Sequence, residues 1–529
     1  MRFVKACLCV PACMTCAFAA TPELTIEIKD YATMPITGAV DGTSNSASLL
    51  ARVNFLREEP GGARKRFFVN DVAGQLYILD KDTKKLTTYL NFNGLEGQPG
   101  IFHRLAIDNL LASGFISFQF DPDYAHNGKF YTIHLEDLAL PASDLPDNKN
   151  FPGFKTAGYT LTPAIRTFGA TQRESVVIEW TDSDISNSTF EGTARELMRV
   201  QYNGRIHPMG DLIFNPTARP GGPDWRVMYI STGDGGSGEQ KTDIRSNPQR
   251  LDTLVGKILR IVPDLKEQID SSTVSENGRY RIPKDNPFAA KPGARKEIWA
   301  YGLRNPHRMS WDVDPADGAN NHLIANVVGL RTWETVDIIH KGANYGYSLR
   351  EGPEELHSDN TLSKPPDVDK IPIRIDESTT DGTVVPTYPV IAYGHIKGTG
   401  GDAVSNGFVY RGKAIPSLRG KFIFGDITTG RVWWVDFKEM LAADDGDPKT
   451  MAEMHEVRIA WNQEVYGTMA PITESVYHAR GGKAEHLPGF ARVSGGRSDI
   501  RFAMDSDGEL YILSKSDGMI RAIVGAIAK

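Results

Sequence analysis

Two similar stretches near opposite ends of the chain decide the class of fold: Asp71-Val-Ala-Gly-Gln-Leu-Tyr-Ile-Leu79 and Asp505-Ser-Asp-Gly-Glu-Leu-Tyr-Ile-Leu513. Each begins with a short turn, in which Asp hydrogen-bonds its own backbone and Gly takes the positive φ that closes a hairpin. The turn leads into a run of apolar and aromatic residues that is typical of a β-strand. Both stretches therefore predict a tight turn followed by a short strand.

Looser copies of this pattern begin at Asp121, Asn215, Asp314 and Gly425. Strands of this length need partners, and a hairpin repeated along a chain with variable spacers is typical of propeller blades. No segment longer than a turn or two has a convincing 3.6-residue amphipathic pattern. We therefore expect an all-β fold, a six-bladed β-propeller with long loop insertions, at roughly residues 138–161, 263–280 and 353–380.

The composition of the 529-residue chain limits its partners. Hydrophobic residues make up 40% and charged residues 24%, as in globular proteins. The chain contains 59 Lys and Arg residues and 66 Asp and Glu residues, and it has no block of basic residues. Nucleic acid is therefore not an expected partner. Beyond the first residues, no stretch of about 20 apolar residues occurs, so we expect no transmembrane segment.

The first residues resemble a targeting signal. A basic start is followed by a short apolar run and the small–x–small site Ala17-Phe18-Ala19, which is typical of a secretory signal peptide. We expect a signal peptide over residues 1–19, an irregular lead-in over 20–44 and the propeller over 45–529. The mature protein would be periplasmic or secreted and would contain no disulfides, because all the cysteines lie in the signal: Cys7, Cys9, Cys13 and Cys16. A lipoprotein signal ending at Cys13 is the alternative.

His207 has a setting that the other histidines lack. It begins the segment His207-Pro-Met-Gly-Asp-Leu-Ile-Phe214, at the mouth of a predicted strand, and Asp234 lies in the loop after the next strand. Adjacent antiparallel strands would bring these two residues to the same end of a blade. An Asp beside a His raises the basicity of the imidazole and fixes its tautomer, as a general base requires. A structural His–Asp hydrogen bond is the other interpretation of the same pair.

Further motifs agree with one family. Ile282-Pro-Lys-Asp-Asn-Pro-Phe288 and Glu297-Ile-Trp-Ala-Tyr-Gly-Leu-Arg-Asn-Pro306 are the most specific of a series that covers most of residues 114–513. In this series the chain resembles the glucose/sorbosone dehydrogenase family, soluble exported six-bladed propellers that oxidise sugars with pyrroloquinoline quinone (PQQ) and calcium. The resemblance is closest to the branch of soluble aldose sugar dehydrogenases that also contains relatives of hedgehog-interacting protein.

The resemblance implies a role for each matching residue. His207 corresponds to the general base that takes the proton of the sugar's anomeric hydroxyl, and Asp234 to the carboxylate that orients it. Arg304 and Asn305 correspond to the pair that holds the cofactor, and an Arg suits this role because PQQ carries carboxylates. Glu334 falls where an acidic cofactor-site residue is usual.

Calcium in this family is held by two consecutive backbone carbonyls, which correspond here to Gly329 and Leu330. The chain departs from the family pattern nearby, with Val328 before this pair, Leu330 in place of a common Pro, and Thr335 where a second acidic residue is common. Ala112 also replaces a usual Gln or Glu. The arginines that some members offer to PQQ before the last strand do not align, although Arg497 and Arg501 lie close to that place in the sequence.

The sequence thus predicts an exported, PQQ- and calcium-dependent aldose or sorbosone-type dehydrogenase with a small sugar substrate and an external electron acceptor. Two alternatives come from other classes. One is a non-catalytic propeller that binds carbohydrate or protein, and the other is a metal-dependent lactonase or hydrolase on the same scaffold. Fold analogy alone does not choose among them.

Overall fold

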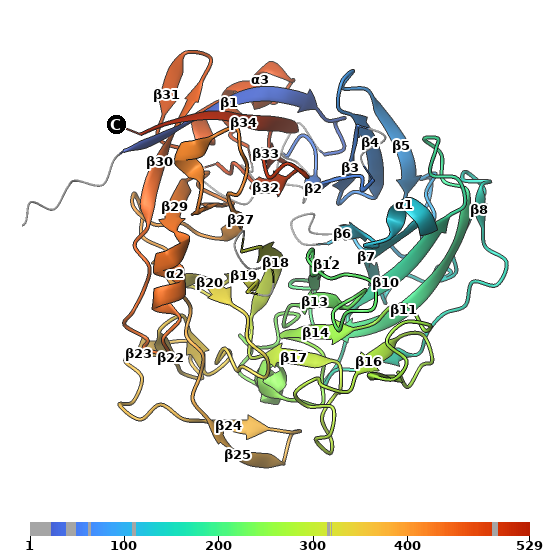
Figure 1. Ribbon diagram of the computed structural model, residues 1–529, viewed down its shortest axis with the longest axis vertical. Coiled ribbons are helices and arrows are strands. Elements are labelled where there is room, and N and C mark those ends of the chain that lie inside the picture. The colour runs from blue at the N-terminus through green and yellow to red at the C-terminus, as the bar shows by residue number, and fades with distance from the viewer. Residues whose placement is uncertain are drawn as a thin grey trace, which may run out of the picture.

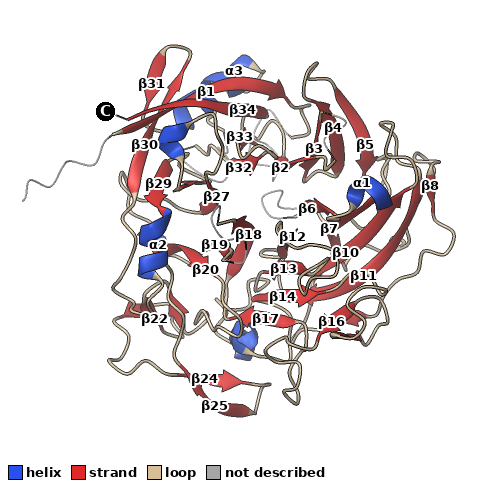
Figure 2. Ribbon diagram, viewed as in Figure 1, coloured by secondary structure: helices blue, strands red, loops and turns tan. Residues whose placement is uncertain are grey.

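Short antiparallel strands dominate the structure, a computed structural model that describes residues 23–38, 49–61, 65–107, 113–314, 318, 320–488 and 496–528. The predicted signal peptide, its four cysteines and Ala112 lie outside these residues. The described helices are short: α1 (Tyr124–Asn127), α2 (Phe437–Ala443), α3 (Ala470–Ala479) and the 3-10 helices η1 (Asp243–Gln249) and η2 (Pro416–Leu418). Figure 2 shows them at the margins of an all-β architecture. The all-β class is therefore confirmed. None of the helices in the described residues is long and apolar enough to cross a membrane.

Four sheets follow one another along the first three quarters of the chain. The first contains β2 (Val53–Glu58), β3 (Arg66–Asp71), β4 (Gln75–Asp80) and β5 (Leu86–Asn91) in that order. The second contains, in spatial order, β6 (Phe115–Phe120), β7 (Lys129–Asp137), β10 (Arg173–Asp182), β11 (Gly192–Tyr202) and β8 (Phe154–Lys155), with β9 (Ala164–Ile165) also paired to β11. The third contains β12 (Met209–Phe214), β13 (Met228–Thr232), β14 (Lys257–Ile261) and β17 (Ile298–Tyr301). The fourth contains β18 (Asn305–Asp312), β19 (His322–Val328), β20 (Trp333–Ile338) and β26 (Ile391–Gly394).

A larger sheet completes the architecture. One half of it contains β27 (Val404–Val409), β28 (Lys421–Asp426), β29 (Val432–Asp436) and β30 (His455–Trp461), with β31 (Glu464–Tyr466) also on β30. The other half contains β1 (Leu24–Thr33), β34 (Met519–Ala528), β33 (Leu510–Ser514) and β32 (Ile500–Met504). A parallel pairing of β1 with β30 joins the two halves.

The sheets are arranged around a common centre. The inner strands contact one another in the sequence β2, β6, β12, β18, β27, β32, and β32 contacts β2 again, so the ring is closed. Figure 1 shows these strands around the centre of the molecule, with later strands of each sheet farther out. Loops that follow the inner strands therefore meet at the ends of one central channel.

The Asp- and Gly-containing turns link consecutive strands, as the sequence predicts. Asp71 to Gly74 joins β3 to β4, where the Asp71 carboxylate accepts from the Ala73 amide at 2.7 Å and Gly74 has φ +128°. Asp505 to Gly508 joins β32 to β33 with the same type of contact. Each carboxylate thus replaces a backbone acceptor and lets the chain reverse within a few residues.

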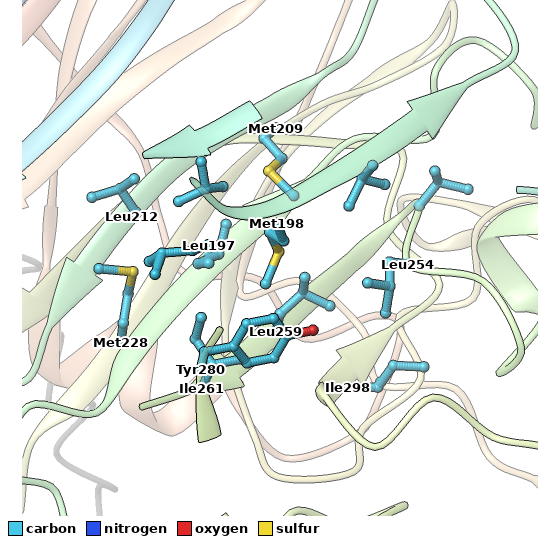
Figure 3. Packing of buried hydrophobic residues seen from close by; sticks show 14 of the residues in the cluster. Leu197, Met198, Met209, Leu212, Met228, Leu254, Leu259, Ile261, Tyr280 and Ile298 are labelled. Carbon is cyan, nitrogen blue, oxygen red and sulfur yellow. The ribbon is translucent and has the colours of Figure 1, made fainter. Parts of the chain in front are cut away.

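The hydrophobic core lies between neighbouring sheets rather than within one sheet. Figure 3 shows one such layer, in which Leu197 and Met198 of β11 face Met209 and Leu212 of β12 and Met228 of β13. All five side chains are fully buried. Packing of this kind fixes each sheet against the next and makes the ends of the channel a rigid platform.

The expectation of an irregular lead-in over residues 20–44 was wrong where the structure describes it, because Leu24–Thr33 forms β1. This strand pairs antiparallel with β34 along most of its length and parallel with β30. Leu24, Ile26 and Ile28 are buried, while the side chains between them are not. The alternation of apolar and polar residues is the sequence signal that identifies such a strand.

The loop insertions contain small satellite sheets at the outside of the ring. The insertion at residues 263–280 pairs β15 (Ser272–Val274) with β16 (Arg281–Pro283). The segment after β20 contains β21 (Arg350–Glu351), β22 (Glu354–Leu356) and β23 (Leu362–Ser363), then β24 (Ile371–Arg374) with β25 (Thr380–Val384). Figure 1 shows β24 and β25 far from the channel, at the lower edge of the molecule.

Candidate functional site

The structure brings His207 and Asp234 into direct contact. Strands β12 and β13 pair antiparallel, with Met209 opposite Thr232, so the residues just before β12 meet those just after β13. The Nδ1 atom of His207 lies 2.7 Å from the Oδ1 atom of Asp234. His207 is 7% exposed and Asp234 is fully buried. The Nε2 atom of His207 remains for a ligand.

The backbone around this pair is closely packed. His207 has φ +53°, a left-handed conformation that costs free energy for a residue with a side chain and that occurs often at functional sites. A Cβ atom on Gly233 would lie 2.4 Å from the His207 carbonyl oxygen, so only glycine fits there. Asp234 also accepts from the amides of Gly236 and Gly238, both at 2.9 Å. The carboxylate therefore has a fixed orientation toward the imidazole.

Burial and nearby charges set the protonation of both groups. Burial and the positive charge of Arg304 lower the pKa of His207, and Asp234 only partly opposes them, so the imidazole is neutral at pH 7. Burial alone would raise the pKa of the Asp234 carboxyl, but His207 and Arg304 hold it below its ordinary value. A neutral imidazole beside an ionised carboxylate is the protonation state that a general base needs.

Carboxylates near the position of Asp234, two residues earlier in the strand register, also bind the entering segment in other sheets. Asp71 and Asp426 end the second strands of their own sheets. The carboxylates of these residues accept backbone amides from the segment that enters the first strand, Arg52 at 2.9 Å for Asp71 and Ala403 at 2.8 Å for Asp426. In the third sheet this partner is the His207 imidazole instead. An acidic residue near the end of the second strand thus recurs in the fold, while the position of Asp234 and its imidazole partner differ from the other two sheets.

Arg304 contacts several other residues of the predicted site. Its backbone carbonyl accepts the Asp234 amide at 2.8 Å. Its guanidinium donates to the carbonyl oxygens of Gly329 and, at 3.3 Å, Val328, and forms an ion pair with Glu239 at 3.1 Å. Burial would lower the pKa of Arg304, but nearby acidic groups raise it, so the side chain stays positively charged. In this arrangement the guanidinium is held by the protein itself.

A cavity of about 280 Å³ opens beside His207 in the central channel. Asn305 shares its wall with His207, and Val328, Ala403 and Ile427 supply apolar surface. Three arginines also line it, Arg308, Arg497 and Arg501, and its wall contains no Asp or Glu among the described residues. A cavity with this lining favours an anionic ligand with a flat apolar part.

The lining arginines are held by the fold but keep hydrogen-bonding capacity. Arg497 and Arg501 bind opposite oxygens of the buried Asp499 at 2.7 and 3.0 Å. Arg308 donates to the carbonyl oxygen of Gly210 at 2.5 Å. In the described part of the chain, the Nε atoms of Arg308 and Arg501 are buried without a hydrogen-bond partner. Sequence reasoning missed Arg308, and it set Arg497 and Arg501 aside as out of register. These two arginines lie close to His207 only because the ring of sheets closes and brings β32 across the channel from β12.

The remaining predicted residues do not line the cavity beside His207. Gly329 lines a second, smaller space of about 30 Å³ together with Arg304, while Leu330 and Glu334 line neither cavity. Glu334 is fully buried, and its carboxylate is occupied by the Gly329 amide at 3.2 Å, the Val404 amide at 2.7 Å and His395 at 2.8 Å. Its position therefore differs from that expected of a residue that touches the cofactor.

The Gly329 carbonyl accepts a cationic group. The guanidinium of Arg304 donates to it, which shows that this oxygen points toward a place where positive charge is favourable. Among the described residues, no group of three or more His, Cys, Asp or Glu side chains is arranged to hold a metal ion. A metal held here would therefore depend on backbone carbonyls, as the sequence predicts.

Comparison with known proteins identifies the family. The model of the Glucose / Sorbosone dehydrogenase family matches residues 62–468. The chain belongs to this family.

This member of the glucose/sorbosone dehydrogenase family is similar to curated proteins of two kinds, HIPL proteins and an aldose sugar dehydrogenase. It is similar to the HIPL1 protein of Arabidopsis thaliana, at 29% identity over 60% of this chain and 43% of that protein. It is also similar to the HIPL2 protein of the same plant, at 29% identity over 71% of this chain and 50% of that protein. The chain thus spans about half the length of these relatives. Aldose sugar dehydrogenase YliI of Escherichia coli matches at 38% identity, over 20% of this chain and 23% of that enzyme.

Solved structures support the fold of the family. The soluble aldose sugar dehydrogenase of Escherichia coli in its apo-form superposes with a TM-score of 0.52, covering 96% of this chain and 99% of that one at 18% identity. A crystal structure of a glucose dehydrogenase superposes with a TM-score of 0.51, covering 90% and 98% at 17% identity. At these identities the likeness concerns the fold, a sugar dehydrogenase-like propeller.

Proposed function

We propose that this protein is an exported, PQQ- and calcium-dependent dehydrogenase of aldose or sorbosone-type sugars. One observation carries the proposal: His207 and Asn305 share the wall of a single cavity with Arg308, Arg497 and Arg501. A base and an array of cations beside one space are what a sugar and a polyanionic quinone require together. Family membership supports the proposal but does not by itself assign an activity.

The proposed architecture is a six-bladed propeller. In this interpretation, each of the four separate sheets is one blade, and the larger sheet contains two blades, β27 to β30 and β32 to β34 with β1. Among the described strands, the pairing that joins the two runs into one sheet is the parallel one between β1 and β30. The closed ring of inner strands supports this division, because each proposed blade contributes one strand to it.

His207 acts as the general base in this proposal. Its Nδ1 atom is engaged by Asp234, so its Nε2 atom takes the proton of the sugar's anomeric hydroxyl. Removal of this proton lets the hydride leave the same carbon, and the sugar becomes a lactone. Bound PQQ would supply the acceptor for the hydride, and an external acceptor would reoxidise it. Asp234 stabilises the imidazolium that forms, because it remains ionised while buried.

The cavity beside His207 fits the charge of PQQ. The sequence predicts too few cationic partners for a trianionic cofactor, but the structure adds three arginines to the cavity wall. Each charge-assisted hydrogen bond contributes roughly 1.5–3 kcal/mol. Asn305 would contact the ring system, since its side chain lies on the same wall.

The loop that contains Gly329 and Leu330 fits calcium on one condition. Calcium takes about six to eight oxygen ligands, and two backbone carbonyls supply only part of this set. The carboxylates of PQQ and water would supply the rest, and Arg304 would move from the Gly329 carbonyl to the cofactor. Calcium bound there would act as a Lewis acid.

Reconstitution tests the proposal. Calcium and PQQ are added to the full-length protein, and dye reduction is measured over a panel of aldoses. We expect activity that is lost in His207→Ala and Arg304→Ala, and a PQQ-dependent rise in Tm, because a ligand selective for the native state stabilises it. Activity that survives either substitution contradicts the residue roles, and the absence of a Tm shift contradicts cofactor binding.

A non-catalytic propeller that binds carbohydrate or protein is the second candidate. It is favoured by the contacts of Arg304, whose guanidinium is already used by Gly329, Val328 and Glu239. Asp71 and Asp426, which bind backbone amides near the same end of their sheets, point the same way. This candidate predicts binding to a glycan or protein that is unchanged in His207→Ala and that needs neither PQQ nor calcium.

A further inference from the structure

A single carboxylate oxygen holds most of the loop that follows β19. Oε1 of Glu351 accepts hydrogen bonds from four consecutive backbone amides, those of Leu330 at 3.1 Å, Arg331 at 2.8 Å, Thr332 at 2.8 Å and Trp333 at 3.1 Å. Glu351 is 4% exposed. Consecutive amides that converge on one anion form a nest, and each contact is assisted by the charge of the carboxylate.

The preceding amide is held in the same way by a different residue. The Gly329 amide donates to Oε1 of Glu334 at 3.2 Å. Five consecutive amides, from Gly329 to Trp333, thus point at two buried carboxylates. The loop therefore has an amide face that is fully occupied by acidic side chains.

The hairpin of β21 and β22, which contains Glu351, contacts the loop at two further points. The indole of Trp333 donates to Glu354 at 2.6 Å. The same side chain packs on Gly352, where an added Cβ would lie 2.8 Å from Trp333 Cβ. The second strand of this hairpin begins the predicted surface insertion at residues 353–380, so that end of the insertion packs against the loop.

The opposite face of the loop meets positive charge. The carbonyl oxygens of Val328 and Gly329 both accept from the guanidinium of Arg304. The loop thus has acidic groups beside its amides and a cation beside its carbonyls, and this arrangement favours one orientation of its peptide planes. Rotation of its peptide planes would leave Glu351 buried without donors, which is costly.

We propose that Glu351 is a positioning residue that holds this loop so that the Gly329 carbonyl points toward a cation. Arg304 is that cation in this structure, and calcium would take its place, with the Leu330 carbonyl as a further ligand, if the proposed cofactor site were filled. This inference rests on the proposed function for the identity of the metal, but the orientation of the loop does not depend on it. Glu351 itself touches neither sugar nor cofactor.

Hydrogen exchange tests the orientation in the full-length protein without added metal. Glu351→Ala should speed exchange of the amides of residues 330–333 by at least about tenfold, since each loses a charge-assisted bond. Glu351→Gln keeps a neutral acceptor and should show a smaller increase. Glu355→Gln is the matched control, because Glu355 lies on the same hairpin and forms no bond to these amides. Unchanged exchange in Glu351→Ala overturns the inference.

Calcium affinity separates positioning from general stability. With calorimetry of calcium and PQQ, we expect Kd for calcium to rise at least about tenfold in Glu351→Ala, with partial recovery in Glu351→Gln and no change in Glu355→Gln. Faster exchange together with a wild-type calcium Kd overturns the inference, because the role is then only structural. If Glu351→Ala does not fold, hydrogen exchange and the Kd for calcium are measured in Glu351→Gln instead. The Tm of that variant shows that it is folded.

The two arms also keep the inference distinct from the proposed function. A wild-type protein that binds no calcium with PQQ present contradicts the metal in the proposed function and the metal part of this inference. Protection of residues 330–333 that depends on Glu351 would still support the orientation of the loop. Calcium binding without that dependence would support the proposed function and overturn the role of Glu351.

Discussion

The imidazole of His207 and the carboxylate of Asp234 lie 2.7 Å apart, although 27 positions separate them in the chain. Both side chains are buried, and the protein holds the imidazole neutral and the carboxylate ionised. The contact exists because β12 and β13 pair, so the fold itself creates the pair. A substitution that removes the charge of Asp234 but keeps the shape of its side chain tests whether this pair takes part in catalysis.

Asp234→Asn tests that question. The variant keeps the size of the side chain but removes the negative charge that holds His207 in one tautomer. If His207 is the base, kcat of the reconstituted enzyme should fall about 10²- to 10⁴-fold. The acid limb of the pH–rate profile should shift to lower pH, because Asp234 raises the pKa of His207. Asp71→Asn is the control, since it changes a buried carboxylate that binds backbone amides and Thr37, and it should lower Tm with kcat retained. Equal losses of kcat in both variants would contradict a catalytic pair.

Arg501→Gln tests the anionic cavity. Arg501 lines the wall opposite His207 and is 4% exposed. Loss of one charge-assisted contact should raise the Kd for PQQ roughly 10- to 150-fold, corresponding to about 1.5–3 kcal/mol. Calorimetry with PQQ measures the change. Arg411→Gln is the control, because Arg411 pairs with Asp312 and neither residue lines the cavity. An unchanged Kd in Arg501→Gln would place the cofactor elsewhere.

Asp337 should make stability depend on pH. Burial raises the pKa of this carboxyl to about 7, against about 3.9 for a free Asp, and Thr335 provides its hydrogen bond. Between these values the folded protein holds a proton that the unfolded chain has lost. The free energy of unfolding therefore falls as pH rises from about 4 to about 7, by on the order of 3 kcal/mol.

Asp337→Asn removes this titration. Thermal unfolding between pH 5 and pH 8 should show a smaller loss of Tm in the variant, which becomes more stable than the wild-type protein at pH 8. Burial also raises the pKa of Glu334 to about 7, so some pH dependence remains. Asp367→Asn, at a side chain that is 91% exposed, should match the wild-type slope. Parallel slopes for Asp337→Asn and the wild-type protein would contradict the prediction.

Strand β1 should be essential to stability. Ile26 is fully buried between β34 and β30, and Ile26→Ala removes a large apolar side chain from that layer. We expect a loss of about 2–5 kcal/mol in the free energy of unfolding. Denaturant unfolding measures it, with Ile36→Ala as the control at a side chain that is 47% exposed. A small effect at Ile26 would mean that the strand packs only loosely.

Local sequence patterns predict the parts of this fold that depend on neighbouring residues. The turns at Asp71 and Asp505 need only their own residues, and they are hairpins in the structure. The approach of His207 to Asp234 follows from one strand pairing and was also predictable. The expectation of an irregular lead-in was wrong because Leu24–Thr33 forms a strand, and the partner that stabilises it, β34, lies far away in the sequence.

The cation array was harder to predict because it depends on ring closure. Arg308 lies on β18, while Arg497 and Arg501 lie nearly two hundred residues later, and no local pattern links them. The same holds for Glu351, whose four partners lie about twenty positions earlier in a loop without a recognisable motif. The family resemblance did not predict these arginines, because it compares aligned positions. An arginine can supply positive charge to the channel from any strand that faces it, whether or not its position aligns.

The pairing of β1 with β34 has a consequence for biosynthesis. Translation produces β1 before β34, so the edge of β1 that pairs with β34 stays open until the strands between them have been made. Prematurely terminated polypeptides would lack the partner and keep an open edge available to chaperones and proteases. The pairing of β1 with β34 thus makes completion of this sheet a late step in the assembly of the ring.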